Sequence, residues 1–547
     1  MAKYIFVVGG VMSGVGKGVT AASLGTILQA RGYTVTALKI DPYINVDAGT
    51  MNPTEHGEVF VTHDGDETDQ DVGNYERFLN KDILRRNYMT TGRVYQSVIQ
   101  RERNLEYHGK CVEVVPHIPE EVIQRIQHAT KADKADITII EVGGTVGEYQ
   151  NILFLEAARL LKYRHPNDVA FVLVSFLPVP GTLGEMKTKP TQHAIQMMHA
   201  AGIQPDFVVC RSTQPIDEPR RRKISTFGSI PESSVIASPD MESIYHIPLQ
   251  LEREKFAEKL ITRLGIRVRR SKKNTAWRRM VAKMERAHGT VTIGIVGKYF
   301  ATGEFILPDA YISVIEAIRH AGIALGGKPN IVWINSDEYE KKSHTLAELQ
   351  ACDAVIVPGG FGKRGIEGKI KAIEYVRKNA IPYLGLCYGM QLATIEFARH
   401  VAGLRSAHTT EVDPDTKHPV IHIMPDQAAK LAEKQYGNTM RLGAYPCILD
   451  KHSRSYALYG NQKISERHRH RYEFNNAYRE QLERHGLRFA GLSPDKSLVE
   501  VIELPDHPFF IATQFHPEFL SRPLQPHPLF LGLVKAAMQR RKKRASS

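Results

Sequence analysis

The sequence has few cysteines and no long apolar run, and both features narrow the class of protein. Its five cysteines are scattered, odd in number and never form a CxxC pair. That distribution argues against a disulfide framework and against a structural zinc site. No stretch approaches the ~18–20 uninterrupted apolar residues of a membrane span, and the start, MAKYIFVVGG, lacks the features of a signal peptide. We therefore expect a cytoplasmic protein without a membrane partner.

The sequence also lacks the motifs of nucleic-acid binding, although its formal net charge is +13. Part of the excess lies in two basic runs, at 267–273 and 540–544. Basic runs of this kind are usually solvated or disordered. Nucleotide triphosphates are anions too, and they attract positive charge as nucleic acid does. We therefore assign the positive balance to nucleotide substrates and solubility, and expect no nucleic-acid partner.

Two regions of the chain alternate apolar strands with helical segments, which predicts two α/β domains, the first a doubly wound parallel sheet. The strand patterns of the first region lie at 4–10, 33–40, 135–144, 168–176 and 206–212. Those of the second lie at 290–299, 329–335, 352–360 and 381–389. The expected limits are 1–266 and 290–539 for the domains, 267–289 for a partly helical linker and 540–547 for a basic tail.

A glycine-rich loop joins the first strand to the first helix and is typical of phosphate binding. Its glycines let N–H groups approach a phosphate, the helix N-terminus adds positive potential, and Lys17 would neutralise charge. The pattern GxxxxGK[ST] fails twice, because Val11 stands at its first glycine and Gly18 replaces the metal-binding Ser or Thr. A tight structural turn is the alternative. Because Gly16 and Lys17 open a helix, we favour a nucleotide-phosphate site.

If Gly18 cannot hold a metal ion, carboxylates are the remaining candidates, since Mg²⁺ prefers hard oxygen ligands. Asp71 ends the acidic segment 64–71, and Glu141 ends an apolar strand. Open α/β sheets place ligands at the carboxyl ends of strands. A solvated loop explains the acidic segment equally well, so the residues alone leave the choice of ligand open.

A second motif, Gly385-Leu386-Cys387-Tyr388-Gly389, follows an apolar strand and precedes a helical segment. It is the cysteine form of a nucleophile elbow, which exposes the sulfur at a helix N-terminus and favours thiolate. Far downstream, His516 could serve as general base and acid, and Glu518 could orient it. An inert buried cysteine is the common alternative. The elbow context favours a nucleophile.

Together these features resemble the CTP synthase family over nearly the whole chain. The segments specific to that family are KIDPYINVD (39–47), HGEVFV (56–61), GGTVG (143–147), KTKPTQ (187–192), LPDAY (307–311), TMRLG (439–443) and RHRHRYE (467–473). The Cys387, His516 and Glu518 motifs alone would suit any class I glutamine amidotransferase. The resemblance implies two doubly wound α/β domains, an N-terminal P-loop domain of the dethiobiotin-synthetase type and a C-terminal flavodoxin-like class I glutaminase domain.

The resemblance implies ATP-dependent amination of UTP to CTP, in pyrimidine nucleotide biosynthesis. ATP would phosphorylate O4 of uracil, Cys387 would take glutamine through a thioester, and the ammonia released would displace phosphate at C4. It also implies Mg²⁺, GTP as an allosteric activator, CTP as a feedback inhibitor, and a homotetramer that often forms filaments.

Site residues follow from the same resemblance, position by position. The metal ligands would be Asp71 and Glu141, and Asp240 lies in the segment expected near the adenine. ATP and its phosphates would be held by Ser13, Gly14, Val15, Gly16, Lys17, Gly18, Val19 and Asp71. UTP and CTP would be held by Ser13, Glu148, Tyr149, Gln150, Lys187, Thr188, Lys189, Pro190, Thr191, Gln192 and Lys223. Glutamine would be held by Gly360, Tyr388, Gly389, Met390, Gln391, Glu411 and Arg471.

Several positions depart from the family pattern. Glu148-Tyr149-Gln150 stands where most members have Asp-Ile-Glu, in a segment linked to CTP feedback. Gly14 replaces a usual serine and Tyr388 a usual leucine, and the loop 300–306, linked to the GTP response, is longer than usual.

Two other functions are alternatives. An ATP-dependent amidoligase that amidates a carboxylate would have a similar build, but the KTKPTQ and DPYINVD segments belong to uridine-nucleotide enzymes. A non-catalytic assembly protein would not need the catalytic positions, and every one of them is intact here.

Overall fold

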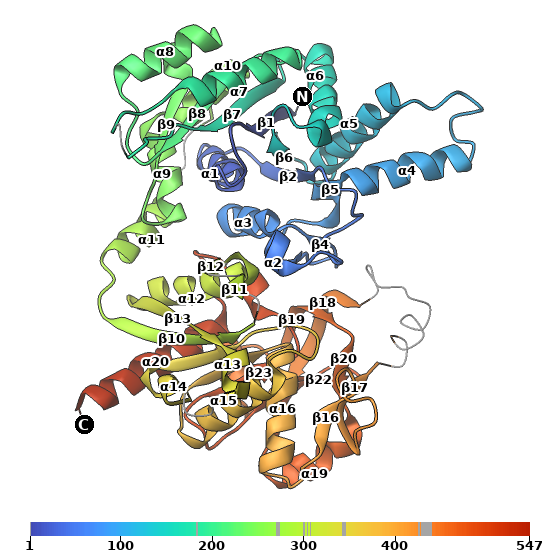
Figure 1. Cartoon of the computed structure of the whole chain (residues 1–547), viewed down its shortest axis with the longest axis vertical. Coiled ribbons are helices and arrows are strands. Elements are labelled where there is room, and N and C mark those ends of the chain that lie inside the picture. The colour runs from blue at the N-terminus through green and yellow to red at the C-terminus, as the bar shows by residue number, and fades with distance from the viewer. Residues whose placement is uncertain are drawn as a thin grey trace. The chain divides into compact units, whose positions relative to one another are not determined.

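The computed structural model describes residues 2–181, 184–269, 274–298, 301–302, 305–306, 308–341, 346–424, 427 and 440–546. The long loop at 300–306 therefore lies partly outside the described residues. The chain divides into two compact units (Figure 1), which we call unit 1 and unit 2. Unit 1 comprises Met1–Ala48 and Asp71–Val281, and unit 2 comprises Gly49–Gln70 and Ala282–Ser547.

The main sheet of unit 1 has seven strands in the order β5-β2-β6-β1-β7-β8-β9, and every neighbouring pair is parallel. The strands are β1 (Lys3–Gly9), β2 (Val35–Asp41), β5 (Tyr88–Thr90), β6 (Ile137–Thr145), β7 (Val169–Phe176), β8 (Phe207–Ser212) and β9 (Val235–Pro239). The order reverses beside β1, since the chain returns through β6 before it continues to β7. Such a reversal is where α/β sheets bind ligands, and the glycine-rich loop follows β1 directly.

Helices cover both faces of this sheet, which confirms the predicted doubly wound fold. Tyr4, Phe6 and Val8 of β1 share a buried cluster with α5, α6 and α7, whereas α1 packs on β1, β2 and β6 together with α9 (Figure 1). The helices are α1 (Lys17–Gln29), α3 (Gln70–Leu79), α4 (Thr91–Arg103), α5 (Val114–Ala132), α6 (Ile152–Arg164), α7 (Lys189–Ala200), α8 (Glu218–Gly228), α9 (Ile247–Arg253), α10 (Phe256–Arg263) and α11 (Thr275–Glu285).

The main sheet of unit 2 is mixed and has nine strands in the order β13-β10-β14-β15-β23-β22-β21-β18-β19. The first five are parallel, and the others pair antiparallel. The strands are β10 (Thr290–Gly297), β13 (Lys328–Asn335), β14 (Ala354–Val357), β15 (Tyr383–Leu386), β18 (Arg441–Leu449), β19 (Lys463–His470), β21 (Arg488–Leu492), β22 (Val499–Glu503) and β23 (Phe510–Thr513). The four strands that the sequence predicts are β10, β13, β14 and β15, all from the parallel half.

Smaller elements complete unit 2. A three-stranded sheet and two short strand pairs comprise β16 (Ala407–Thr409), β17 (His418–Ile423), β20 (Tyr472–Phe474), β3 (Phe60–Val61), β4 (Glu67–Thr68), β11 (Ala301–Thr302) and β12 (Phe305–Ile306). The helices are α2 (Pro53–His56), α12 (Ile312–Leu325), α13 (Ser336–Lys341), α14 (Glu348–Ala351), α15 (Ile366–Lys378), α16 (Tyr388–His400), α18 (Arg454–Tyr459), α19 (Arg479–Arg484) and α20 (Pro528–Ser546).

The C-terminal basic run differs from the solvated tail expected at 540–547, because it continues helix α20. Arg540 donates a hydrogen bond to the backbone oxygen of Ala380 at 3.3 Å, and Arg541 lies 3.5 Å from the carboxylate of Asp353. The helix thus carries its arginines to acceptors on unit 2, and part of the positive charge at this end has a structural use.

The segment Gly49–Gln70 lies inside the predicted N-terminal domain, 1–266, but belongs to unit 2. The Glu58 carboxylate accepts a hydrogen bond from the backbone N–H of Ser313 at 3.1 Å. The rings of Phe60 and Phe519 meet edge to face, with centroids 5.1 Å apart. The two compact units therefore differ from two continuous halves of the sequence at this segment.

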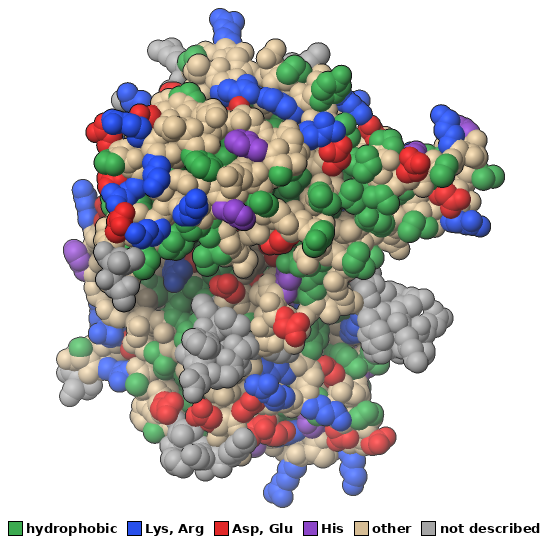
Figure 2. All heavy atoms as spheres, turned by 45° about the horizontal axis from the view of Figure 1, so that its top comes forward, with side chains coloured by type: hydrophobic (Ala, Val, Ile, Leu, Met, Phe, Trp, Pro, Cys, Tyr) green, Lys and Arg blue, Asp and Glu red, His purple; other side chains and the backbone are tan. Residues whose placement is uncertain are grey.

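One face of the molecule shows charges of both signs. On the face shown in Figure 2, Lys and Arg side chains are interspersed with Asp and Glu side chains. Among the described helices, none combines the length and the apolar composition that crossing a membrane would require.

Candidate functional site

Cys387 stands at the turn between β15 and α16, in a backbone conformation that few non-glycine residues adopt. Its φ is 50° and its ψ is −99°, which is the strained geometry of a nucleophile elbow. The glycines on either side are sterically required. A Cβ at Gly389 would lie 2.1 Å from the backbone oxygen of Val357, and one at Gly385 would lie 2.7 Å from the Tyr383 hydroxyl.

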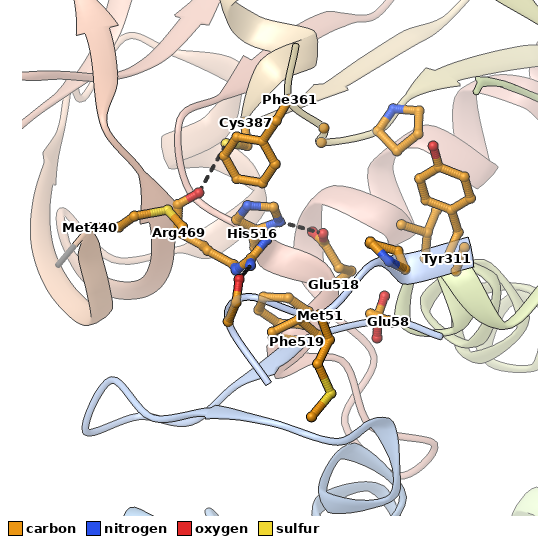
Figure 3. Close-up of a pocket in the computed structure, with 18 of the residues that line it drawn as sticks. Met51, Glu58, Tyr311, Phe361, Cys387, Met440, Arg469, His516, Glu518 and Phe519 are labelled. Atoms are coloured by element: carbon orange, nitrogen blue, oxygen red, sulfur yellow. Dashed lines mark hydrogen bonds and ion pairs between the residues drawn. The ribbon is translucent and has the colours of Figure 1, made fainter. Parts of the chain in front are cut away.

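His516 and Glu518 lie beside this cysteine, as the sequence predicts. Nδ1 of His516 and Oε1 of Glu518 are 2.7 Å apart (Figure 3). Burial alone would lower the pKa of His516, but the Glu518 carboxylate and the Cys387 sulfur outweigh it and raise that pKa to about 10. A Cβ at Gly359 would lie 2.8 Å from the His516 ring and 3.7 Å from Cβ of Cys387. The three side chains thus lie in the arrangement that a nucleophile, its base and an orienting carboxylate require.

Two further groups contact the sulfur, and sequence reasoning missed both. The Gln514 side-chain amide donates to Sγ at 3.6 Å, and the Sγ of Cys387 donates to the backbone oxygen of Arg469 at 3.7 Å (Figure 3). Gln514 is fixed in turn by Gln391, whose amide donates to it at 3.3 Å. The QFHPE segment that contains His516 also contains Gln514, but nothing in the pattern alone marks an amide as a sulfur contact.

A cavity of about 580 Å³ opens in front of these residues, a size that suits a small ligand. One part of its wall comes from the segment Gly49–Gln70, and Figure 3 shows Met51 and Glu58 of that segment beside Phe519 and Tyr311. The lining residues are Gly49, Thr50, Met51, Pro53, Glu58, Val59, Ala310, Tyr311, Val314, Pro358, Gly359, Gly360, Phe361, Cys387, Met440, Arg469, Arg471, His516, Glu518 and Phe519.

The residues predicted to hold glutamine lie in and around this cavity. Gly360 and Arg471 line it, and Tyr388, Gly389, Met390 and Gln391 form the first turn of α16, directly after Cys387. Glu411 is not among the residues that line the cavity. Its carboxylate accepts a hydrogen bond from the backbone N–H of Gly362 at 2.8 Å. Burial raises the pKa of Glu411, although that hydrogen bond and Lys298 oppose the shift.

The glycine-rich loop of unit 1 has the backbone of a phosphate cradle. Gly14 and Gly16 have φ values of 71° and 89°, and Val11 has a φ of 78°. Helix α1 begins at Lys17, so the predicted Ser13, Val15, Gly18 and Val19 surround its N-terminus. A Cβ at Gly9 would lie 2.8 Å from Nζ of Lys17, so this glycine makes room for the lysine. Burial lowers the pKa of Lys17, while Glu141 and Asp71 raise it.

Asp71 and Glu141, which lie 70 positions apart in the sequence (141 − 71), both contact the ammonium of Lys39. Nζ of Lys39 lies 2.5 Å from Asp71 and 2.9 Å from Glu141. Burial and the nearby Asp71 raise the pKa of Glu141 to about 7. Two carboxylates that face one positive charge fit Mg²⁺, which would take its other ligands from phosphate oxygens and water. The described residues contain no group of three or more His, Cys, Asp or Glu that could enclose an ion by themselves.

The residues predicted for UTP and CTP lie on several elements. Lys189 and Pro190 open α7, the Gln192 amide donates to Thr188 at 3.2 Å, and Thr191 bonds Ser175 at 2.7 Å. Lys187 pairs with Glu185 at 2.6 Å.

The remaining predicted nucleotide residues include both engaged and exposed side chains. Glu148 accepts from the Thr145 backbone at 3.0 Å, and Asp240 pairs with Arg211 at 2.7 Å. Tyr149 and Gln150 are exposed, and Lys223 is exposed on α8.

Comparison with known proteins assigns the chain to a family. Residues 3–266 match the family described as CTP synthase N-terminus, and residues 306–536 match glutamine amidotransferase class-I. A CTP synthase of Caldanaerobacter subterraneus is 51% identical over 540 residues, with 98% of each chain covered. One of Thermococcus gammatolerans is 49% identical over 543 residues, with 99% of each covered.

Among solved structures, the glutaminase domain of Trypanosoma brucei CTPS with bound acivicin is 38% identical, with a TM-score of 0.42. The match covers 46% of this chain and 94% of that one. Since the relatives match along their full length and both family profiles are present, this chain belongs to the CTP synthase family.

Proposed function

We propose that this chain makes CTP from UTP and ATP, with glutamine as the nitrogen donor. One observation carries the proposal: a chain similar over its full length to CTP synthases holds both a cysteine nucleophile with its histidine and a phosphate loop with paired carboxylates. The two chemistries belong to the two halves of one reaction, since glutamine supplies ammonia only after its amide bond is broken.

In unit 2, the Cys387 thiol would give its proton to His516, and the resulting thiolate would attack the glutamine amide carbon. The imidazolium would then protonate the departing ammonia and leave a glutamyl thioester. Water, activated by the neutral His516, would hydrolyse that thioester to glutamate. Glu518, 2.7 Å from the ring, holds the tautomer and stabilises the positive charge. Gly360, Arg471, Glu411 and residues 388–391 are our candidates for binding glutamine.

In unit 1, the loop from Ser13 to Val19 would bind ATP phosphates, with Lys17 offsetting their charge. Mg²⁺ held by Asp71 and Glu141 would neutralise charge on the transferred phosphoryl group. Phosphorylation of O4 turns a poor leaving group into a good one, and ammonia then displaces phosphate at C4. Asp240 is our candidate beside the adenine.

Lys187, Lys189 and Lys223 are our candidates for the triphosphate of UTP, with 188–192 around them. CTP would share these charges as feedback inhibitor, and residues 148–150 would meet its ribose or base. We further propose GTP as activator and a homotetrameric, filament-forming assembly in the cytoplasm, on the strength of the family resemblance alone.

The test is CTP formation from UTP and ATP, measured with glutamine and then with ammonium salts. Both nitrogen sources should support synthesis, and omission of UTP should abolish it. A matched assay with carboxylic acids in place of UTP distinguishes the amidoligase alternative. Amide formation from a carboxylic acid, without CTP formation from UTP, would overturn the proposal.

A further inference from the structure

The loop 359–364, which lies beside Cys387, is hydrogen-bonded by the side chain of Lys298. Lys298 follows β10, is 4% exposed, and donates hydrogen bonds to three backbone oxygens of the loop 359–364. These acceptors are the oxygens of Phe361, of Gly362 at 3.1 Å and of Arg364 at 3.0 Å. An ammonium has three N–H donors, so this one side chain can hold the loop at three backbone oxygens.

Tyr388 provides a second hold on the same loop. Its hydroxyl donates to the backbone oxygen of Gly362 at 3.3 Å, while the N–H of Gly362 donates to Glu411 at 2.8 Å. Gly362 is therefore fixed through both of its polar backbone groups. Because Tyr388 directly follows Cys387, the same residue ties the loop to the nucleophile. The leucine usual at this position in the family has no hydroxyl with which to do so.

A second lysine faces the Tyr388 ring. Nζ of Lys298 lies 5.7 Å from the ring centroid, and Nζ of Lys369, on α15, lies 5.8 Å from it. Lys369 is fully buried, and within the described part of the chain its ammonium has no hydrogen-bond partner. Two ammonium groups beside one ring repel each other. When Lys369 is protonated, this repulsion pushes the ammonium of Lys298 away from its place beside the loop.

The other charges around the pair do not cancel this repulsion. Among the described residues, Asp337 is the carboxylate that favours the charged form of Lys369, and it is already paired with Arg364 at 2.7 Å. Glu411, Asp337 and Glu340 favour the charged form of Lys298, and Arg364 opposes it. Burial is the main cause that lowers the pKa of Lys369 to about 7, and the positive charge of Lys298 is the second cause. Burial also lowers the pKa of Lys298, to about 8. As pH falls through neutrality both lysines become charged.

We propose that Lys298 and Tyr388 are positioning residues for glutamine hydrolysis: they hold the loop 359–364 against Cys387, and protonation of Lys369 loosens that hold. Enzymes of acyl transfer stabilise the oxyanion with the N–H after the nucleophile and an N–H from a second loop. Tyr388 and the loop 359–364 supply those two elements here. This inference rests on the proposed glutamine chemistry of Cys387.

The first experiment compares Lys298→Met and Tyr388→Phe with Lys371→Met. Lys371 is a matched control because it lies on the same helix as Lys369 and bonds the backbone oxygen of Tyr339 instead. We measure glutamate release, CTP formation with ammonia, and alkylation of Cys387 by iodoacetamide. Lys298→Met should lower kcat/KM for glutamine by about 10- to 100-fold, mainly through kcat, and Tyr388→Phe by about 3- to 10-fold. Ammonia-dependent synthesis and alkylation should stay within about twofold.

Unchanged glutamine kcat/KM in Lys298→Met overturns the proposal. Parallel loss of glutamine turnover, alkylation and ammonia-dependent synthesis also overturns it, because Lys298 would then support the fold as a whole. Failure of the proposed function has a different signature, namely wild-type protein that releases glutamate but forms no CTP.

The second experiment measures glutamine kcat/KM against pH for wild type, Lys369→Met and Lys371→Met. Wild type and Lys371→Met should lose activity together below about pH 7, as Lys369 gains its proton. Lys369→Met cannot gain it, so its acid limb should lie at lower pH. Superimposable acid limbs for wild type and Lys369→Met would remove Lys369 from the proposal. A mere packing role for Lys369 would shift the rate equally at all pH values.

Discussion

The carboxylate of Asp71 occupies the space that a side chain at Gly18 would need. A Cβ at Gly18 would lie 2.0 Å from Oδ1 of Asp71, closer than any pair of non-bonded atoms can approach. The phosphate loop therefore departs from the GxxxxGK[ST] pattern for a steric reason. Where other P-loops place a Ser or Thr hydroxyl, this loop has the Asp71 carboxylate from another segment, and Nζ of Lys39 lies 2.5 Å from that carboxylate.

Restoring the common residue should therefore damage the enzyme. Gly18→Ser should lower CTP synthesis by at least about tenfold with either nitrogen source, since the new side chain displaces Asp71. The control is Ser23→Ala on the same helix, whose hydroxyl has no hydrogen-bond partner within the described residues. Wild-type turnover in Gly18→Ser would show that Asp71 can move without consequence.

The two nitrogen sources separate the halves of the reaction. Cys387→Ala should abolish glutamine-dependent CTP formation and leave ammonia-dependent formation largely intact, because the thioester requires the sulfur and free ammonia does not. Steady-state rates with each source, on protein with an unchanged melting temperature, give the answer. Cys447→Ala is a useful control, since that thiol is also buried. Loss of both activities in the folded Cys387 variant would contradict the assignment of glutamine hydrolysis to unit 2 and of CTP formation to unit 1.

The phosphate site should be required with either nitrogen source. Lys17→Ala and Asp71→Asn should each lower synthesis by about 10²-fold or more, and Asp71→Asn and Glu141→Gln should raise the Mg²⁺ concentration needed for half-maximal rate. Titration of Mg²⁺ at fixed ATP measures this shift. The ligand assignment is wrong if Asp71→Asn retains normal turnover and the wild-type Mg²⁺ response.

Feedback by CTP should be weaker than in relatives that carry Glu at the position of Gln150. A carboxylate accepts charge-assisted hydrogen bonds of about 1.5–3 kcal/mol, whereas a neutral amide offers about 0.5–1.5 kcal/mol. Gln150→Glu should tighten inhibition by roughly tenfold per 1.4 kcal/mol, with little change in UTP affinity. Gln150 is exposed, so the change costs no packing. Overlapping inhibition curves at equal UTP would place CTP away from this turn.

Lys369 should also lower the stability of the protein. Burial lowers its folded pKa to about 7, while in the unfolded chain the pKa is about 10.4. The unfolded state binds more protons between these values, so stability should rise as pH increases from about 7 to about 10. Lys369→Met should stabilise the protein below that window, by about 2–4 kcal/mol. Thermal melts at pH 6.5 and pH 10 measure the difference, which should shrink at the higher pH. An equal effect at both pH values would contradict the titration of Lys369.

Sequence patterns predicted the parts of the fold that repeat a strand–helix unit. The strand expected at 135–144 is β6 (Ile137–Thr145), and that at 4–10 is β1 (Lys3–Gly9), because a strand buried on both faces is a near-continuous apolar run. Strand β19 was missed. Its sequence, KISERHRH, is rich in charge, yet Arg467 and His468 are fully buried. Only tertiary partners make such a strand stable.

The candidate catalytic residues were predictable because a nucleophile elbow and a histidine–carboxylate pair have local patterns. Lys298 had no such pattern. Its role depends on backbone oxygens more than 60 positions downstream, and any residue type can supply a backbone oxygen. The same holds for Arg469, whose backbone oxygen meets the sulfur of Cys387.

The segment Gly49–Gln70 has a consequence for how the protein is made. Glu67 pairs with Arg469 at 2.7 Å, and the two residues lie 402 positions apart in the chain. At a synthesis rate of about 5–20 residues per second, roughly 20–80 s pass between the two. Throughout that interval β3 and β4 have already been synthesised, but the downstream strands and aromatic rings against which they pack have not. The first half of the polypeptide therefore cannot finish folding as it emerges, and completion of its fold must wait for the C-terminal end of the message.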